Sequence, residues 1–357
     1  MSLLLNIPLE LRELIIGHVL YAPTSPPVTP IESDGVEYND LRYKAWPGGG
    51  AKTYYTQQSM TSPSSCVSLL LTNHQISVET RAILQRMKVD YILDISVKDD
   101  LTLFLIWLSV PCLTTHISTL YANVRLFGNI ADEKIIRSQL GDGGRLGFHW
   151  SFYAALERFL RYGPVAEKRS KEKDNSQKSR WNIQEFEDRG MLIDTLVLDF
   201  QSAELELAFP PENITYDHWS SRHCGSDKFD RSEIPRILST YTTRPEWLCR
   251  YMQDWICHLL GMDYCTSRYG QLLYERIGTI QMLVDGQLEY EFDLAAWLAG
   301  LNFTDPRETM GHLPANERVP GFWKWKRDTL LRREAQGLPV RPPSDDASDK
   351  RDEEYVI

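Results

Sequence analysis

Apolar residues recur at helical spacing in the opening segment of the chain, MSLLLNIPLELRELIIGHVL. Residues 8–20 predict a helix, because Pro8 suits its first turn and the apolar positions follow a period near 3.6. On a helical wheel these positions form two stripes, where a surface helix normally has one. The first stripe holds Leu9, Ile16 and Leu20. The second stripe holds Leu11, Leu14, Ile15, His18 and Val19, and Arg12 lies between the two.

Local patterns predict the elements that follow. Residues 22–65 contain the runs PTSPPVTP, GGG and SPSS, which predict a loop or disordered insertion. A second helix is predicted over residues 67–86, where one side carries Leu69, Ile76, Ile83 and Met87. Strict alternation in VDYILDISV, residues 89–97, predicts a strand. Asp99 or Asp100 is expected to cap a helix that reaches about residue 110.

The second half of the chain alternates between strand and helix patterns. Strands are predicted at residues 117–127 and 193–200, and helices at residues 150–161, 245–260 and 323–334. Strand, helix, strand, helix, strand in this order favours parallel pairing through crossover helices. Within residues 279–294, Asp285 and Gly286 separate two alternating runs. This pattern predicts a β-hairpin, because both turn positions favour positive φ.

These elements predict an α/β (or α+β) fold. An N-terminal helical hairpin is expected to pack on a mixed, partly parallel sheet that has crossover helices and a C-terminal β-hairpin. The charged run EKRSKEKDNSQKSR predicts a mobile loop, and the end of the chain predicts a disordered tail. The expected organisation is helices in 1–21 and 66–87, an insertion at 22–65, an α/β domain at 88–337 with its charged loop at about 165–182, and a tail at 338–357.

Composition narrows the class of protein. The 357 residues are 42% hydrophobic and carry a net charge of −10, which argues against a general binder of nucleic acid or anionic membranes. The longest apolar run, residues 103–113, is too short to span a bilayer. The first eight residues lack a basic segment, and the six cysteines form no C-x-x-C pair. A cytoplasmic or nuclear protein with reduced thiols is therefore expected.

Motifs for catalysis or cofactor binding are missing from the sequence. No G-x-S-x-G, H-E-x-x-H or Walker loop occurs, and no strand leads into the glycine-rich residues 141–147. The spacing of the histidines and cysteines does not supply the paired ligands of a zinc site; these residues are His218, His223, Cys224, Cys249, Cys257, His258 and Cys265. The acidic segments 185–188 and 227–233 are interpreted as solvated loops. No catalytic residue, metal or cofactor is predicted.

Aromatic and cationic residues alternate in PGFWKWKR, residues 320–327. Such a mixture can stack on bases or lie at a membrane interface. The interpretation that we favour is a C-terminal helix whose Trp323 and Trp325 pack on the body of the domain while the cations face water.

Two segments carry a resemblance to a known family. Residues 7–16, IPLELRELII, resemble the opening of an F-box, and residues 69–76, LLLTNHQI, resemble its later helix. In this order the blocks are similar to a large group of fungal F-box-like proteins of the form L-P-x-E-L-R-x-x-I followed by L-L-x-T-C-R-Q-I-x-x-E-A. Gln75, Ile76 and Glu79 stand at matching positions, whereas Asn73 stands where the pattern has Cys.

The resemblance implies a substrate receptor of an SCF-type ubiquitin ligase. In such a receptor the N-terminal helices dock on a Skp-type adaptor, and the rest of the chain holds a protein target. The candidate adaptor-binding residues are Ile7, Pro8, Leu9, Leu11, Leu14, Ile15, Ile16 and Ile76. Two alternatives stay open: a non-catalytic scaffold with a vestigial F-box, and an enzyme whose site is assembled from distant residues. A stripe left uncovered by the folded chain would need a partner to bury it.

Overall fold

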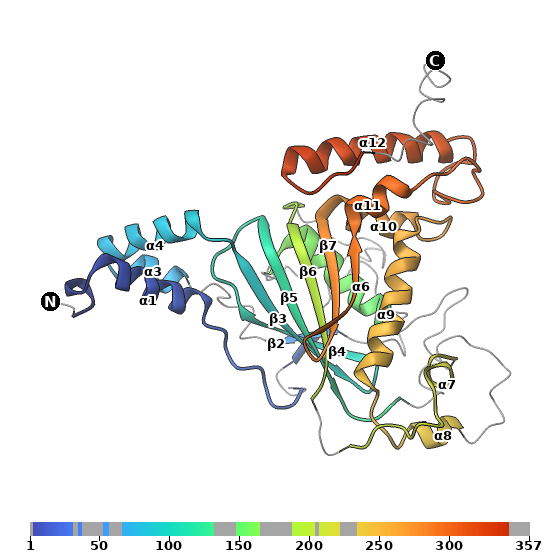
Figure 1. Cartoon of the computed structure of the whole chain (residues 1–357), viewed down its shortest axis with the longest axis horizontal. Helices are drawn as coiled ribbons and strands as arrows, with labels where there is room; N and C mark the ends of the chain where they lie inside the picture. The colour runs from blue at the N-terminus through green and yellow to red at the C-terminus, as the bar shows by residue number, and fades with distance from the viewer. Residues whose placement is uncertain are drawn as a thin grey trace, which may run out of the picture.

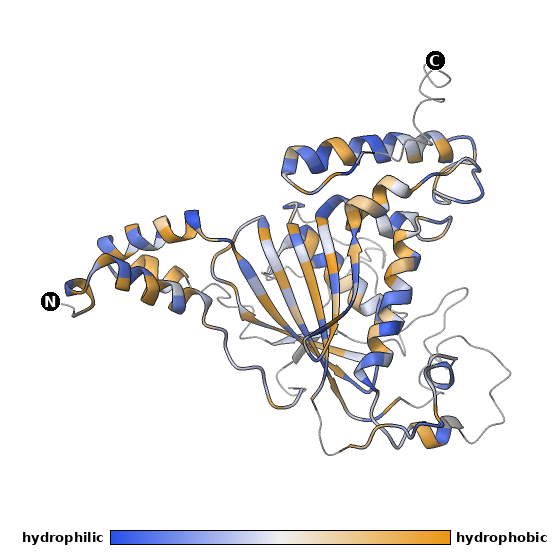
Figure 2. Cartoon of the chain, viewed as in Figure 1, coloured by the Kyte–Doolittle hydropathy of each residue, from blue (hydrophilic) through white to orange (hydrophobic). Residues whose placement is uncertain are grey.

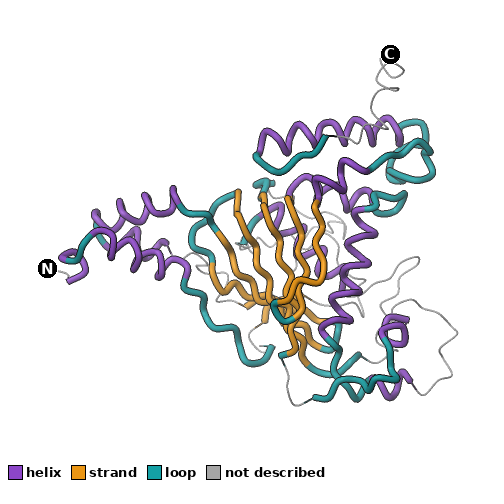
Figure 3. Tube along the Cα trace, viewed as in Figure 1, coloured by secondary structure: helices purple, strands orange, loops and turns teal. Residues whose placement is uncertain are grey.

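The computed structural model describes residues 3–30, 35–37, 53–56, 66–131, 148–164, 188–203, 207–221 and 234–342. This part of the chain forms an eight-stranded mixed sheet with helices around it and a group of helices at its N-terminal side (Figures 1 and 3). The expected α/β class is confirmed. The glycine-rich segment 141–147, the charged run 167–180 and residues 343–357 lie outside the described residues.

The strands are β1 (Gly35–Glu37), β2 (Thr53–Thr56), β3 (Asp90–Lys98), β4 (Thr102–Ser109), β5 (His116–Phe127), β6 (Leu192–Ser202), β7 (Ile277–Val284) and β8 (Gln287–Asp293). The α-helices are α1 (Leu9–Tyr21), α3 (Cys66–Thr72), α4 (His74–Arg86), α6 (Phe148–Tyr162), α7 (Tyr216–Ser220), α8 (Ile234–Leu238), α9 (Pro245–Leu260), α10 (Ser267–Arg276), α11 (Leu294–Gly300) and α12 (Arg318–Gln336). A 3₁₀ turn, η1 (Leu3–Asn6), precedes α1.

Four parallel strands form the centre of the sheet. Its order is β1-β2-β4-β3-β5-β6-β7-β8, and β3, β5, β6 and β7 are parallel neighbours. The sequence predicts parallel pairing for β3, β5 and β6, whereas it predicts β7 only as one arm of a hairpin. These strands follow one another across the sheet in a single direction. Because crossovers between parallel strands are right-handed, successive crossovers in one direction place their helices on the same face. Helices α6 and α9 accordingly share one hydrophobic core with that face.

The predicted helix at residues 99–110 is wrong, because these residues form a turn and strand β4. Asp99 and Asp100 have φ values of 52° and 57°, so they make a tight turn between antiparallel β3 and β4 and do not cap a helix. The apolar run LFLIWL that follows has no clear period, and a short run of this kind fits a buried strand as well as a helix.

The insertion at residues 22–65 contributes to the sheet, which the sequence does not predict. Strand β2 pairs with β4 in parallel, with Thr53 opposite Leu103, and β1 pairs with β2 antiparallel. The backbone N–H of Thr24 donates to Leu108 O at 2.9 Å, so the chain after α1 also follows the outer edge of β4.

Much of the C-terminal half agrees with its sequence pattern, whereas the sequence does not predict helices α10 and α11. Asp285 and Gly286, at φ values of 48° and 77°, form the turn between β7 and β8, and helices α6, α9 and α12 cover the predicted ranges. The expected tail at 338–357 starts with a packed segment. Leu338 is buried, and Arg333 Nε donates to Pro339 O at 2.9 Å.

The N-terminal helices form a small unit beside the sheet. Helices α1, α3 and α4 project from the side of the molecule in Figure 1, and they have a core of their own, separate from that of the sheet. The predicted single helix at 67–86 is two helices, since α3 ends at Thr72 and α4 starts at His74. Cys66 N–H donates to Pro111 O at 3.1 Å and ties α3 to the loop after β4.

Candidate partner-docking site on the N-terminal helices

One of the two stripes of α1 is buried within the helical unit. Ile16 and Leu20 are 1% and 0% exposed, and they share a core with Cys66, Ile76 and Ile83 of α3 and α4. Leu9, which the helical wheel places in the same stripe, is 45% exposed at the first turn of the helix. The internal stripe therefore starts one to two turns into α1.

The second stripe of α1 is left exposed by the described part of the chain. Its apolar members are Leu11, Leu14, Ile15 and Val19, which are 50%, 61%, 42% and 47% exposed. We call these four residues the α1 stripe. Residues 11, 15 and 19 succeed one another at intervals of four, so they lie along one side of the helix, with Leu14 beside them. Figure 2 shows the apolar residues around α1 on a unit that extends away from the sheet. A continuous apolar face of this kind marks an interaction surface more often than isolated apolar residues do.

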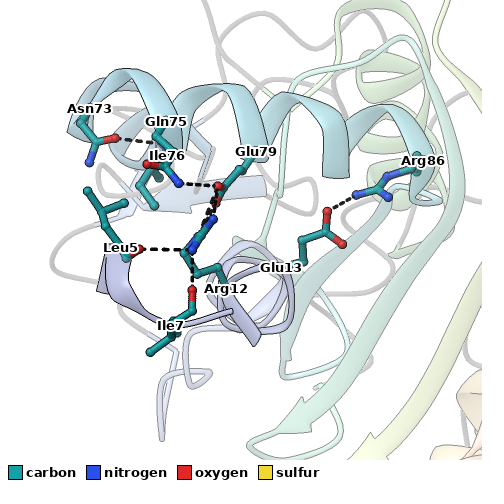
Figure 4. Close-up of polar contacts among 9 residues, drawn as sticks. All are labelled: Leu5, Ile7, Arg12, Glu13, Asn73, Gln75, Ile76, Glu79 and Arg86. Carbon is teal, nitrogen blue, oxygen red and sulfur yellow. Dashed lines mark hydrogen bonds and ion pairs between the residues drawn. The ribbon is translucent and has the colours of Figure 1, made fainter. Parts of the chain in front are cut away.

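Arg12 holds α1 against α4 (Figure 4). Its Nε and Nη2 donate to the carboxylate of Glu79, with the shortest contact at 2.7 Å, and both side chains are about one-tenth exposed. Its Nη1 donates to Ile7 O at 2.5 Å, which fixes the turn before α1. The hydrogen bonds from Arg12 lower the pKa of Glu79 below its ordinary value, because they stabilise the ionised carboxylate. Such a bidentate pair has a defined geometry, so it sets how α1 is presented.

Three further polar contacts define the unit. Asn73 Oδ1 accepts a hydrogen bond from the backbone N–H of Ile76 at 2.9 Å and so caps the N-terminus of α4 (Figure 4). Gln75 Nε2 donates to Glu79 at 3.0 Å, on the same carboxylate that Arg12 binds. Arg86 pairs with Glu13 at 2.6 Å, and this pair is largely exposed. These contacts connect the C-terminal end of α4 to α1 and fix the first turn of α4.

The structure divides the candidate adaptor-binding residues into two groups. Leu9, Leu11, Leu14 and Ile15 are exposed side chains of α1, Pro8 is exposed just before it, and Ile7 is half-buried. Ile16 and Ile76 are buried against each other's helices, so they stabilise the unit and do not lie on its surface. Val67 and Leu71 of α3 are also exposed, at 45% and 79%, and the family resemblance does not single them out.

Among the described residues, the histidines and cysteines that could supply chemistry do not converge. His218 caps its own helix through Thr215, and His258 pairs with Asp263 at 3.2 Å. Burial raises the pKa of Cys249 to about 12 and also raises that of Cys257, so both thiols stay protonated. His223 and Cys224 lie outside the described residues. Among the described residues, no group of three or more His, Cys, Asp or Glu side chains could hold a metal ion.

A cavity of about 40 Å³ lies between α6 and the helix-covered face of the sheet. Its lining is apolar except for Arg158, and it includes Leu93, Trp107, Phe152 and Phe159. None of the histidines or cysteines singled out above lines this cavity. Its volume corresponds to about one or two water molecules.

The tryptophans of residues 320–327 pack on the domain, as favoured above. Trp323 Nε1 donates to Phe303 O at 3.2 Å, and Trp325 Nε1 donates to Glu275 at 3.0 Å. Lys326 does not face water: it is buried, and its Nζ donates to Ala299 O and Leu301 O at 2.9 and 2.7 Å. Burial lowers the pKa of Lys326 to about 8. Lys326 therefore caps the C-terminus of α11.

None of the described helices has the length and apolar character to span a bilayer. The acidic segment 227–233 and residues 185–187 lie outside the described residues, while Asp188 binds Arg161 at 3.0 Å.

In comparisons of the chain with known proteins, no family model, no curated protein and no solved structure matches it.

Proposed function

We propose that this chain is an F-box-like interaction protein whose N-terminal helices dock on the Skp-type adaptor of an SCF-type ubiquitin ligase. The α/β remainder would hold a protein target for ubiquitination. Such a receptor acts in the cytoplasm or the nucleus and needs no catalytic residue of its own, because the ligase supplies the chemistry.

The observation that carries this proposal is the uncovered α1 stripe. The residues that resemble an F-box, 7–16 and 69–76, fold side by side as α1, α3 and α4. Within this unit Arg12 and Glu79 join the two blocks directly. The buried stripe already packs α1 against the rest of the helical unit. Packing within the unit therefore does not explain the exposed apolar side chains of Leu11, Leu14 and Ile15, whereas a partner would.

Binding between the purified full-length chain and a purified Skp-type adaptor tests the proposal, with isothermal titration calorimetry as the measurement. We expect association at micromolar concentrations or tighter. Leu14→Asp should weaken it by about 30-fold or more, because a charge placed in the buried centre of an apolar interface costs on the order of 2 kcal/mol.

Leu331→Asp is the matched control. Leu331 lies on α12 and is 61% exposed, the same fraction as Leu14. The Leu331→Asp substitution should leave adaptor binding unchanged. Absence of binding by the unaltered chain at micromolar concentrations would overturn the proposal and favour the alternative, a scaffold with a vestigial F-box. Equal weakening by both substitutions would show that the α1 stripe is not the docking site.

A further inference from the structure

One face of the sheet carries no helix in the described part of the chain. Helices α6 and α9 pack on the face that holds the hydrophobic core, and α6 is seen behind the strands in Figure 1. The opposite face is turned toward the viewer. It carries no described helix because the parallel strands progress in one direction, so that the crossover helices are all placed on the same side. The chain after α1 lies against the β3 and β5 part of this face, where Arg125 Nη2 donates to Pro27 O at 2.9 Å.

This face, on which no described helix packs, carries polar side chains on its β5 to β8 side. Tyr121 Oη donates to Asp199 Oδ2 at 2.7 Å, and Gln201 Nε2 donates to the same carboxylate. Gln281 Nε2 donates to Glu291 Oε2 at 2.8 Å across the β7–β8 pair. Hydrogen-bonded polar side chains of this kind do not suit the docking of an apolar helix or sheet, because their polar atoms would lose access to water.

Carboxylates predominate on this side, and Asp293 at the end of β8 is already paired with Arg341. Glu289 and Glu291 are exposed on β8, Asp199 is buried on β6, and Asp285 lies at the turn between β7 and β8. Burial, together with the nearby charges of Asp199 and Glu246, raises the pKa of Asp285. On the β5 side the cation Arg125 is already paired, since its guanidinium binds Asp94 at 2.5 and 2.8 Å.

Strand β8 is also an edge of the sheet. Its one strand partner in the described chain is β7, and Gln287, Leu288, Glu289 and Glu291 are exposed along it. The outer edge of such a strand presents backbone donors and acceptors to any extended segment that lies beside it. The side chains of an added strand would alternate between the two faces of the sheet, and every second one would stand next to Glu291 and its neighbours.

We propose that β8 binds an extended segment of a partner protein that carries Lys or Arg at alternate positions. The backbone of the segment pairs with β8, and its cations contact Glu289 and Glu291. A second copy of this chain does not fit, because antiparallel pairing of two β8 strands would bring acidic side chains against one another. Nucleic acid does not fit either, because its phosphates would be repelled. The identification of this segment as a ubiquitination target rests on the proposed function, but the binding itself does not.

Fluorescence anisotropy of full-length protein tests the proposal with a labelled peptide of alternating Lys and Thr. We expect this peptide to bind and the corresponding Glu-Thr peptide not to bind. The double variant Glu289→Gln, Glu291→Gln should weaken binding by roughly three- to tenfold, since both carboxylates are exposed and each ion pair is modest. The double control Glu308→Gln, Glu317→Gln removes the same charge from exposed positions distant in the sequence and should have no effect.

Backbone pairing is tested separately from charge. The Lys-Thr peptide is made with N-methyl groups at every second residue, in both registers, and one of the two should lose binding because its donors toward β8 are blocked. Weakening that is equal in both double variants, or equal binding of all peptides, would show nonspecific attraction to an acidic protein and overturn the proposal. Absence of binding by the Lys-Thr peptide would also overturn the proposal. Loss of adaptor binding would remove the ligase assignment alone, since the peptide is measured without the adaptor.

Discussion

Arg12 of α1 forms a bidentate ion pair with Glu79 of α4, a residue 67 positions later in the chain. The pair joins the two segments that resemble an F-box, across the insertion that separates them. Because Arg12 also binds Ile7 O, the same guanidinium fixes the turn that precedes α1. The orientation of the α1 stripe therefore depends on a polar contact as well as on the apolar core beneath it.

Glu79→Gln is expected to destabilise the helical unit and lower its melting temperature by a few degrees, because the guanidinium of Arg12 loses its ionised partner. Hydrogen–deuterium exchange of the α1 and α4 amides measures the effect. Glu13→Gln, in the exposed pair with Arg86, is the control and should cause no measurable change. Equal exchange in the two variants would contradict a structural role for Arg12 and Glu79.

The stability that the Glu79 carboxylate contributes should be lost at acidic pH. Arg12 lowers the pKa of Glu79 in the folded state below the ordinary value of 4.5, so the unfolded state takes up the proton first as the pH falls. The stabilisation is fully present above pH 4.5 and is lost as the pH falls through the folded pKa. Urea unfolding of the unaltered chain and Glu79→Gln should therefore differ at pH 7 and converge in acid. A difference that stays constant with pH would contradict this assignment.

The cap of α4 gives a separate prediction. Asn73→Ala should destabilise the helical unit by about 0.5–2 kcal/mol, because the N–H of Ile76 loses its acceptor. Asn73→Asp keeps an acceptor at the same place and should retain most of the stability. The measurement is urea unfolding followed by circular dichroism. An Asn73→Asp variant as unstable as Asn73→Ala would show that the hydrogen bond at this cap is not the source of the effect.

Two glycine-to-alanine substitutions in helices are expected to change stability with opposite signs. A Cβ at Gly270 of α10 would lie 2.2 Å from Leu259 O at the end of α9, so Gly270→Ala should cost about 1–3 kcal/mol of stability. Gly17 of α1 has open space, and Gly17→Ala should stabilise the helix by up to about 1 kcal/mol. Denaturant unfolding of both variants checks the signs. A Gly270→Ala variant of unchanged stability would show that α9 and α10 are not in such close contact.

The elements that the sequence predicts well are those with a local signal. Alternation in residues 89–97 and the Asp285-Gly286 turn are properties of a few neighbouring residues, and both elements are observed. Strand β4 has no such signal, because its apolar run fits a strand or a helix, and the positive φ of Asp99 and Asp100 depends on the pairing of β3 with β4. Strand β2 depends on β4 in the same way, so it could not be predicted before β4.

The candidate site shows a similar division. The helical wheel identifies two stripes from the sequence alone, but which of them is buried depends on where α4 lies. Leu9 and Ile16 share a stripe on the wheel, and the contact with Ile76 and Ile83 covers Ile16 while Leu9 remains exposed. Arg12 was expected only to separate the stripes. Its burial depends on Glu79, which is adjacent in space and remote in sequence.

Adjacent residues of α1 should separate folding from docking. Ile16→Asp places a charge in the core shared with Ile76 and Ile83, and we expect a loss of roughly 3–5 kcal/mol and rapid amide exchange throughout α1 and α4. Ile15→Asp lies on the α1 stripe, where the side chain is 42% exposed, so stability should change by about 0.5 kcal/mol or less. If the proposed function holds, Ile15→Asp nevertheless loses adaptor binding. A strongly destabilised Ile15→Asp variant would show that the chain itself covers the α1 stripe, and the argument for a partner at this site would then fail.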